Sequence, residues 1–429
     1  MYGRKAFVGF ISRQLRSCVD CDTMQSSCCK LSLRVILIMV LTSCSARTIT
    51  GETTSVPPPV RQTTDTEFSP TGEIEYRDKS LLGAHFVNFS ITEFPIPDFG
   101  RGYGGAIAKL ETYILVATAS GSFIQVDLLN DKIVASNLPK LNMGEVEFGS
   151  SKRITDAETL PRVHDLVVNG TEVYVSYDRY DPSVDGVRFV ISRIIGIGTW
   201  VDIYVSPVLE SSIFPLGSGG AMTLNPSLDS LFFSVGDFSL DEARGLDSDF
   251  AAQSDTLPWG HILKIDLDTL DIQLFSKGHR NPLGLLFVDD YLLSSEMGPR
   301  GGDEINLIES GKNFGWPYES FGTRYDSLIR YESPVNTNNL DLFTEPIWTF
   351  LDSVAPTQMI QSSFFGLSSS NVLMGSLVAE SLFSFRYLEG RIQFMEQILV
   401  NSRVRDLMEF GNLILLLTDT GTMKVIAAA

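Results

Sequence analysis

Short runs of β-branched, aliphatic and aromatic residues recur along most of the chain, and this repetition constrains the fold more than any other feature. The runs begin between 42 and 80 residues apart, at Tyr113–Thr118, Val173–Tyr177, Leu231–Val235, Tyr291–Ser295, Asn371–Leu377 and Leu413–Thr418. Their composition is typical of strands, and helical periodicity is almost absent between them. The sequence therefore predicts an all-β protein built from repeated units.

Two of the repeats share a sharper pattern, an Arg-x-x-Asp opening followed at identical offsets by a Gly and an Asp. The copies are Arg162-Val-His-Asp-Leu166 with Gly170 and Asp178, and Arg403-Val-Arg-Asp-Leu407 with Gly411 and Asp419. Each copy predicts a strand, a turn and a second strand, which is half a blade and cannot bury both faces alone. Repetition at this period predicts a six-bladed β-propeller over residues 79–429, with a large β-sandwich as the structural alternative. In a propeller the Arg-x-x-Asp openings would line the central channel, although an Asp at a strand edge can equally cap a turn.

The N-terminal region reads as an export and anchoring signal. Lys30 and Arg34 precede a short apolar run that ends in Leu41-Thr42-Ser43-Cys44, which resembles a bacterial lipobox. The run is too short to span a bilayer, whereas a basic segment, a short apolar segment and small residues describe a secretory signal. We therefore expect a lipoprotein signal peptide over residues 1–43, with Met24 as a possible start, and lipidation of Cys44. The alternative is a buried strand with an incidental cysteine.

The region after Cys44 is rich in Thr, Ser and Pro, including Pro57-Pro58-Pro59, and this composition predicts a flexible tether over residues 44–78. Ser45 resembles the residue that follows the lipidated cysteine in outer-membrane lipoproteins. We expect a location in the bacterial cell envelope, anchored by lipid to the outer membrane and facing the periplasm.

Charge and cysteine content exclude several classes of protein. The formal net charge is −19, so the surface repels polyanions and nucleic-acid binding is not expected. All five cysteines lie within the first 44 residues, so no disulfide framework holds the predicted propeller. His85, His261 and His279 share no zinc-ligand spacing, so a zinc site is not expected. No glycine-rich dinucleotide fingerprint follows a strand, so nicotinamide and flavin cofactors are not expected either.

The stretch from Gly278 to Pro317 carries the most specific motifs of the chain. It contains Gly278-His-Arg-Asn281, Pro299-Arg-Gly-Gly-Asp-Glu-Ile-Asn306 and Gly311-Lys-Asn-Phe-Gly-Trp-Pro317. Together with Ser402-Arg-Val-Arg-Asp406, these motifs resemble the soluble glucose/sorbosone dehydrogenases, which depend on calcium and pyrroloquinoline quinone (PQQ). The resemblance covers roughly residues 90–425. It implies a six-bladed propeller that oxidises the C1 hydroxyl of an aldose to a lactone and passes electrons to a separate acceptor.

The resemblance also implies which residues contact the quinone. Arg280 and Asn281 match the family's quinone-contacting pair, Arg403 and Arg405 match its Arg-x-Arg clamp, and Tyr325 matches a cofactor-contacting tyrosine. PQQ carries three carboxylates, which guanidinium groups can bind through paired hydrogen bonds. The alternative for any one of these arginines is an ordinary surface ion pair.

For calcium, Glu304 matches a family metal ligand and Phe314 a position that contributes its backbone carbonyl. The carbonyls of Gly298 and Pro299 are further candidates, which suits a hard cation that prefers oxygen. The alternative is that Asp303 and Glu304 form a solvated turn.

Three positions depart from the family pattern. Gly217 occupies the position of the catalytic histidine, Val378 that of a quinone-binding lysine, and Leu160 that of a glutamine. Glycine cannot accept a proton, so the general base of the reaction would be missing. His164 is a candidate for a displaced base, with a hydrogen-bonded histidine at a strand end as the alternative.

Two functions follow as hypotheses. The first is a PQQ-dependent sugar dehydrogenase of weakened or altered activity, acting on a small sugar or another polar ligand. The second is a non-catalytic, calcium-binding propeller that binds a ligand or partner at the cell envelope.

Overall fold

The computed structural model describes residues 72–77, 79–84, 87–100, 103–144, 161–209, 216–241, 250–329, 331, 342–364 and 371–428. All of them belong to one compact unit, Glu67–Ala429. The predicted signal peptide, Cys44 and Leu160 lie outside the described residues.

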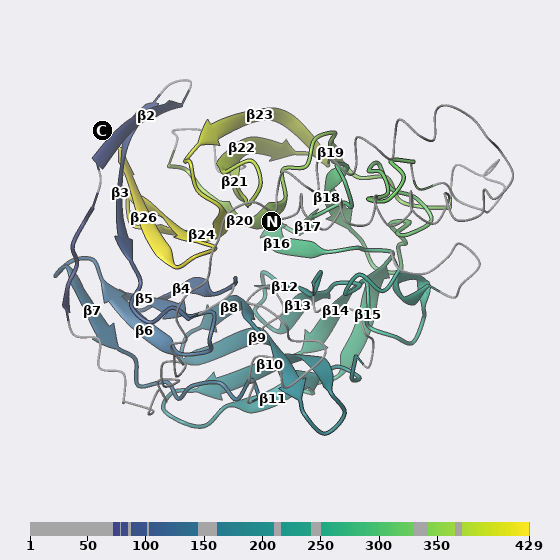
Figure 1. Cartoon of the computed structure of the whole chain (residues 1–429), viewed down its shortest axis with the longest axis horizontal. Coiled ribbons are helices and arrows are strands. Elements are labelled where there is room, and N and C mark those ends of the chain that lie inside the picture. Colours follow the sequence, from purple (N-terminus) through teal and green to yellow (C-terminus); the bar gives the residue numbers. More distant parts are fainter. Residues whose placement is uncertain are drawn as a thin grey trace, which may run out of the picture. The chain divides into compact units, whose positions relative to one another are not determined.

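The described strands form six antiparallel sheets, arranged around a centre as the blades of a propeller (Figure 1). The first two blades contain β4 (Ala106–Leu110), β5 (Tyr113–Ala117), β6 (Phe123–Asp127), β7 (Lys132–Ala135) and β1 (Gly72–Glu73), then β8 (Val163–Asn169), β9 (Glu172–Asp181), β10 (Gly186–Ile195) and β11 (Val201–Val205). The third and fourth contain β12 (Gly219–Leu224), β13 (Ser230–Val235), β14 (His261–Asp266) and β15 (Ile272–Lys277), then β16 (Pro282–Val288), β17 (Tyr291–Glu296), β18 (Asp303–Ile308) and β19 (Trp348–Phe350). The fifth and sixth contain β20 (Pro356–Gln361), β21 (Asn371–Ser376), β22 (Ser381–Leu388) and β23 (Arg391–Leu399), then β24 (Val404–Phe410), β25 (Leu413–Thr418), β26 (Thr422–Ala428), β3 (Val87–Pro95) and β2 (Lys79–Ala84).

The sheets close into a ring, which confirms the predicted six-bladed propeller. The innermost strands β4, β8, β12, β16, β20 and β24 each contact the next, and β24 contacts β4. The sixth blade joins the two ends of the unit, because β3 pairs with β26 along Phe89–Pro95. β1, which lies within the segment predicted as a tether, adds a fifth strand to the first blade through its pairing with β7.

Helices contribute almost nothing to the described residues, whose single helical turn is a 3-10 turn at Ala251–Gln253. No helix in this part of the chain is long and apolar enough to cross a membrane.

The six apolar runs predicted as strands are the second strands of the six blades, β5, β9, β13, β17, β21 and β25. They read as continuous apolar runs because each lies inside its sheet and both faces of the sheet pack against neighbouring blades. β25, for example, is buried at every residue after Leu413.

The predicted half-blades are also confirmed, as β8 with β9 and β24 with β25. In both, a β-bulge at the start of the inner strand places the Arg-x-x-Asp aspartate against the neighbouring blade. Asp165 accepts a hydrogen bond from the backbone N–H of Met222 at 2.6 Å, and Asp406 accepts one from Ile107 at 2.7 Å. These two aspartates therefore fasten one blade to the next at the centre of the ring.

Strand direction gathers the site loops at one face. Every inner strand begins, and every second strand ends, at the same end of its blade, as the pairings Val163 with Tyr177 and Val404 with Thr418 illustrate. We call this end of the propeller the site face.

Candidate functional site at the site face

The site residues predicted from the sequence lie on the site face wherever the structure describes them. Arg280 and Arg403 precede the inner strands β16 and β24, and Gly217 precedes β12. Val378 follows β21, and Glu304 stands at the start of β18, paired with Glu296 of β17. The fold thus brings together positions that are far apart in the sequence.

A small axial cavity lies where the inner strands meet. It is lined by His164, Asp165, Gly219, Ala221, Leu283, Gln358, Arg405 and Asp406, which come from five blades. His164 and Arg405 are the corresponding bulge residues of blades two and six, so the two side chains border one cavity. The repeated Asp165 and Asp406 both line the channel, as predicted.

The predicted arginine clamp is organised by one buried carboxylate. Arg405 donates to Asp419 Oδ1 at 2.8 Å through Nε, and Arg403 donates to Asp419 Oδ2 at 3.0 Å through Nη2. Burial alone would raise the pKa of Asp419, but the two guanidinium groups hold this pKa below its usual value. Two cations share one anion, so the clamp keeps a net positive charge.

A second cavity contains the predicted metal position. It is lined by Gly278, Arg280, Glu296, Met297, Gly298, Pro299, Gly302, Glu304, Phe314, Trp316, Glu319 and Ser320. Glu304, Phe314, Gly298 and Pro299, the four positions predicted for calcium, therefore border one space. Glu296 is a carboxylate that the sequence analysis missed, because only its register with Glu304 brings the two together.

The two glutamates of this cavity repel each other. Asn306 Nδ2 donates to Glu296 Oε1 at 2.5 Å and to Glu304 Oε2 at 3.2 Å, which joins the carboxylates through one amide. Burial and the charge of Glu296 raise the pKa of Glu304 to about 8. His279 Nδ1 lies 3.1 Å from Glu296 Oε1 and supports the second carboxylate from behind.

Asp303 is not part of a solvated turn. Its carboxylate is buried and accepts hydrogen bonds from the backbone N–H groups of Gly298, Val354 and Ala355 at 2.7–2.8 Å. It therefore fixes the loop that shapes the cavity, and the alternative of a plain surface turn is wrong for this residue.

Arg280 and Tyr325 are held by the loop that contains Gly298 and Pro299, and Asn281 is held by blade three. Arg280 Nη1 donates to the carbonyl of Gly298 at 2.7 Å, and its guanidinium carbon lies 5.6 Å from the Trp316 ring centroid. Asn281 is buried, with its Oδ1 accepting a hydrogen bond from Gly219 N at 3.0 Å. Tyr325, 58% exposed, donates its hydroxyl to the carbonyl of Pro299.

The two described positions that depart from the family pattern are both at the edge of this site. Gly217 has φ +77°, a backbone conformation that residues with a side chain rarely adopt. A Cβ placed there would lie 3.6 Å from its nearest heavy atoms, so the surroundings would admit it without a clash. Val378 is 53% exposed and follows Leu377, whose carbonyl accepts a hydrogen bond from Arg403 Nη1 at 3.4 Å.

His164 lies beside the loop that carries Gly217. Its Nε2 is 3.0 Å from Asp178 Oδ1, and Asp178 Oδ2 accepts a hydrogen bond from Ser218 at 3.2 Å. The His164 side chain is 8% exposed and packs directly against Gly220. A buried carboxylate oxygen thus lies within ion-pair distance of one ring nitrogen, although the two atoms form no hydrogen bond in this geometry.

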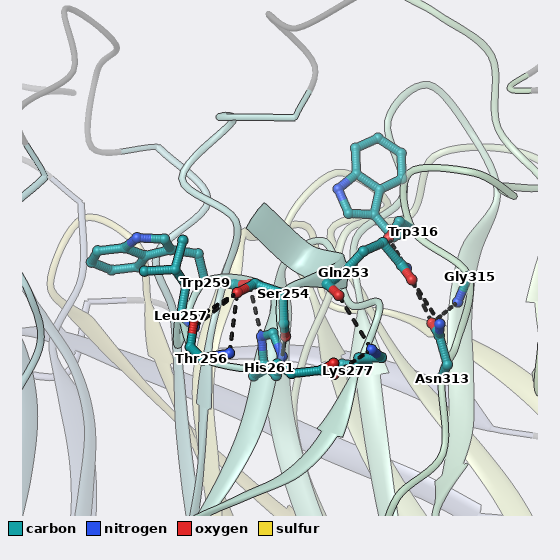
Figure 2. A network of polar contacts seen from close by, with 11 residues as sticks. Gln253, Ser254, Thr256, Leu257, Trp259, His261, Lys277, Asn313, Gly315 and Trp316 are labelled. Carbon is teal, nitrogen blue, oxygen red and sulfur yellow. Dashed lines mark hydrogen bonds and ion pairs between the residues drawn. The ribbon is translucent and has the colours of Figure 1, made fainter. Parts of the chain in front are cut away.

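A polar network supports the second cavity from the third blade (Figure 2). Gln253 Nε2 donates to the carbonyl of Trp316 at 2.6 Å, and Asn313 Nδ2 donates to Gln253 Oε1 at 2.7 Å. Asn313 Oδ1 also accepts a hydrogen bond from Gly315 N at 3.0 Å. These contacts hold the backbone between Phe314 and Trp316, and Gln253 carried no local signal from which sequence reasoning could have found it.

His261 belongs to the same network and is structural. Its ring nitrogens lie 2.8 Å from the carbonyl oxygens of Trp259 and Ser254, and burial lowers its pKa to about 4 (Figure 2). Among the described residues, no three His, Cys, Asp or Glu side chains gather as a metal-binding group.

Sequence comparison gives relatives for parts of the chain. Residues 173–426 match the family described as Glucose / Sorbosone dehydrogenase. An aldose sugar dehydrogenase of Escherichia coli is 37% identical over 90 residues, which span 20% of this chain and 24% of the relative. The quinoprotein glucose dehydrogenase B of Acinetobacter calcoaceticus is 56% identical over 73 residues, which span 16% of this chain and 15% of the relative.

Structural comparison extends the likeness to the fold. The apo-form of a soluble aldose sugar dehydrogenase from Escherichia coli superposes with a TM-score of 0.61 at 17% identity, covering 79% of this chain and 99% of that protein. The PQQ-bound aldose sugar dehydrogenase from Streptomyces coelicolor superposes with a TM-score of 0.56 at 16% identity, covering 83% and 98%.

Proposed function

Because this chain belongs to the glucose/sorbosone dehydrogenase family, we propose that it is a PQQ- and calcium-binding sugar dehydrogenase of weakened activity. It would oxidise the C1 hydroxyl of an aldose to a lactone and pass electrons to a separate acceptor. The observation that carries the proposal is the convergence of the arginine clamp and the Glu296–Glu304 pair on one face of the propeller.

The residues of the second cavity fit a calcium ion. Two buried carboxylates that repel each other would be stabilised by a divalent cation between them, and Ca²⁺ prefers carboxylate and carbonyl oxygens. Glu304 and Glu296 would supply charge, and the carbonyls of Gly298, Pro299 and Phe314 are the neutral candidates.

The arginines fit an anionic cofactor. Arg403 and Arg405 keep a net positive charge beside Asp419, and Arg280 stands at the neighbouring cavity. Guanidinium groups in these positions would pair with the carboxylates of PQQ. When bound, the quinone would supply the acceptor for the hydride that leaves C1.

The site lacks the family's general base for proton transfer. Gly217 cannot take the proton of the C1 hydroxyl, and the residual base we propose is His164. With Nε2 facing Asp178, the imidazole would accept the proton at Nδ1, and Asp178 would stabilise the charged ring.

A second candidate function is a calcium-bound module that binds a ligand without catalysis. It is favoured by the exposed Val378 and by Gly217, which stand where the family has a lysine and a histidine. For either function we propose a lipid-anchored location at the outer membrane, facing the periplasm, which is supported by the residues that lead to Cys44.

The decisive experiment is a titration of the purified mature protein with PQQ and calcium, followed by visible absorbance and by glucose oxidation. We expect binding with slow oxidation in the unaltered protein, and a gain in rate of about 10²–10⁴-fold in Gly217→His, because a positioned base contributes that much. Adding Val378→Lys should tighten PQQ binding, and His164→Ala should remove the residual rate.

The matched control for backbone strain is Gly170→His, which has φ +61° and open surroundings at the opposite end of its blade. It should show the stability cost of Gly217→His without the gain in rate. If neither the unaltered protein nor the Gly217→His, Val378→Lys variant binds PQQ, the dehydrogenase proposal fails and the binding module is favoured.

A further inference from the structure

His279, the histidine of the Gly278-His-Arg-Asn281 motif, lies directly behind the second cavity. Its neighbours Gly278 and Arg280 line this cavity, whereas the side chain of His279 is fully buried and is not part of the lining. The backbone is fixed as well, because His279 N donates to the carbonyl of Gly260 at 3.0 Å. A side chain in this position acts on the site only through the residues that it contacts.

Both ring nitrogens of His279 have a partner, and the two partners define which nitrogen carries the proton. Nδ1 lies 3.1 Å from Glu296 Oε1, and Nε2 lies 2.8 Å from Ser276 Oγ. An ionised carboxylate can only accept a hydrogen bond, so the proton of a neutral ring belongs on Nδ1. Nε2 is then the acceptor for the hydroxyl of Ser276, which fixes the ring in this tautomer.

The hydrogen bond from His279 completes the support of Glu296. Oε1 of this carboxylate also accepts a hydrogen bond from Asn306 Nδ2 at 2.5 Å, and Oε2 accepts one from Arg280 N at 3.2 Å. Asn306 divides its amide between Glu296 and Glu304, so His279 is the side-chain donor dedicated to Glu296. Three donors on two oxygens therefore fix the plane of a carboxylate that lines the second cavity.

The same imidazole ring packs on Phe314. The two ring centroids are 4.7 Å apart with an interplanar angle of 29°, which is a stacked arrangement. Phe314 N donates to the carbonyl of Lys277 at 2.9 Å, so the backbone of Phe314 is also tied to the strand that leads into His279. One buried side chain thus contacts both a carboxylate of the cavity and the residue whose carbonyl is a candidate calcium ligand.

We propose that His279 is a positioning residue for calcium. It holds the Glu296 carboxylate through Nδ1 and the Phe314 residue through the stacked ring, so that both are preorganised before a cation arrives. Groups that stand behind metal ligands orient them, and their loss typically costs about 10–100-fold in metal affinity. This proposal rests on the proposed function, because it concerns the calcium site of that function.

The test measures calcium affinity by calorimetric titration of the purified mature protein, without quinone or sugar. His279→Leu keeps an apolar side chain against Phe314 but removes the hydrogen bond to Glu296, and should weaken calcium binding about 10–100-fold. His279→Asn keeps an amide N–H in the place of Nδ1, and should bind calcium within about three-fold of the unaltered protein.

Nitrogen NMR of labelled histidine supplies a readout that packing alone would not change. Of the four histidines, His279 should carry its proton on Nδ1, and the signal lost in His279→Asn identifies it. Ser276→Ala removes the partner of Nε2 and should lower calcium affinity about three-fold. This variant keeps the proposal testable if His279→Leu does not fold.

Ser206→Ala is the matched control, because its hydroxyl accepts a buried hydrogen bond from Phe189 N at 2.9 Å in blade two. It should lower the melting temperature without changing calcium affinity. In a Glu296→Gln background, His279→Leu should cause little further loss of affinity, because the residue through which it acts is already impaired.

Three results would overturn the positioning role of His279. Calcium affinity could be unchanged in His279→Leu, equally reduced in His279→Leu and His279→Asn, or reduced by the same factor in the Glu296→Gln background. An unaltered protein that binds no calcium would overturn it together with the calcium of the proposed function. Failure of the PQQ titration with these calcium results intact would overturn the dehydrogenase and leave the role of His279 standing.

Discussion

Three buried aspartates position the basic side chains and the loops of the site. Asp419 holds both arginines of the clamp, Asp303 accepts three backbone N–H groups, and Asp178 faces His164. Asp419 and Asp303 are satisfied by hydrogen bonds, as a buried charge requires, whereas Asp178 Oδ1 lies within ion-pair distance of His164 without a hydrogen bond. Glu304 differs, because the charged groups that act on it are carboxylates, chiefly that of Glu296.

This difference predicts how calcium and pH affect stability. The pKa of Glu304 is raised from 4.5 to about 8, so between these values the native protein binds a proton that the unfolded chain does not. The stability from this proton is fully present below pH 4.5 and is lost as pH rises through 8. With a chelator the melting temperature should fall from pH 5 to pH 8, and calcium should restore it most at pH 8.

Other buried acids also contribute to the pH dependence of stability, because burial raises the pKa of Asp165 to about 7. Substitution of Glu304 separates its contribution from theirs. Glu304→Gln should lose the calcium response and only part of the pH dependence. The exposed Glu309→Gln should melt like the unaltered protein under both conditions. A calcium response that survives in Glu304→Gln would assign the metal to other residues.

At the scale of elements, the half-blade is the repeated unit. The aspartate of its Arg-x-x-Asp opening, Asp165 or Asp406, forms a hydrogen bond to the neighbouring blade. β8 and β24 carry this aspartate at a β-bulge, and each reaches a backbone N–H of the next blade. In β12 the corresponding bulge holds Gly220 and Ala221, whose N–H groups both donate to Ser234 Oγ of the same sheet. The blades are thus similar in backbone but fastened by different side chains.

The fastener at the ring closure can be tested by Asp406→Ala. Removing the carboxylate leaves the N–H of Ile107 buried without its acceptor, which should lower the free energy of unfolding by about 1–3 kcal/mol. Denaturant unfolding measures the change, with Asp268→Ala, at an exposed turn, as the control. Equal stability of the two variants would show that water replaces the lost acceptor.

At the scale of the whole molecule, the ring is closed by strands from opposite ends of the unit. β26 pairs along its full length with Phe89–Pro95 of β3, so the sixth blade cannot form until the last strand is present. Residues from the predicted tether also contribute, because Ile74 is buried and its N–H donates to the carbonyl of Asp131 at 2.8 Å. Part of the segment predicted as a tether therefore belongs to the propeller, from Gly72 on.

Anchoring gives a prediction at this scale. Cys44→Ala should release the protein from the membrane fraction into the soluble periplasm, because the lipid and not a membrane-spanning segment would hold it. Cell fractionation with immunodetection measures this, and Ser43→Ala, which keeps a small residue before the cysteine, is the control. Membrane association that persists in Cys44→Ala would contradict the lipid anchor.

The sequence alone determined the repeated architecture and the family, since both depend on local patterns. The apolar runs predict strands because a strand that is buried on both faces of its sheet is a short, continuous apolar segment. The motifs around Arg280, Glu304 and Arg403 are also contiguous in the sequence. The tertiary structure decided which side chains meet. Glu296 faces Glu304 through strand register, Asp419 holds Arg403 through a loop sixteen residues away, and Tyr103 lies beside Arg403 only because the ring closes. Such contacts depend on the packing of blades distant in sequence, and no local pattern records them.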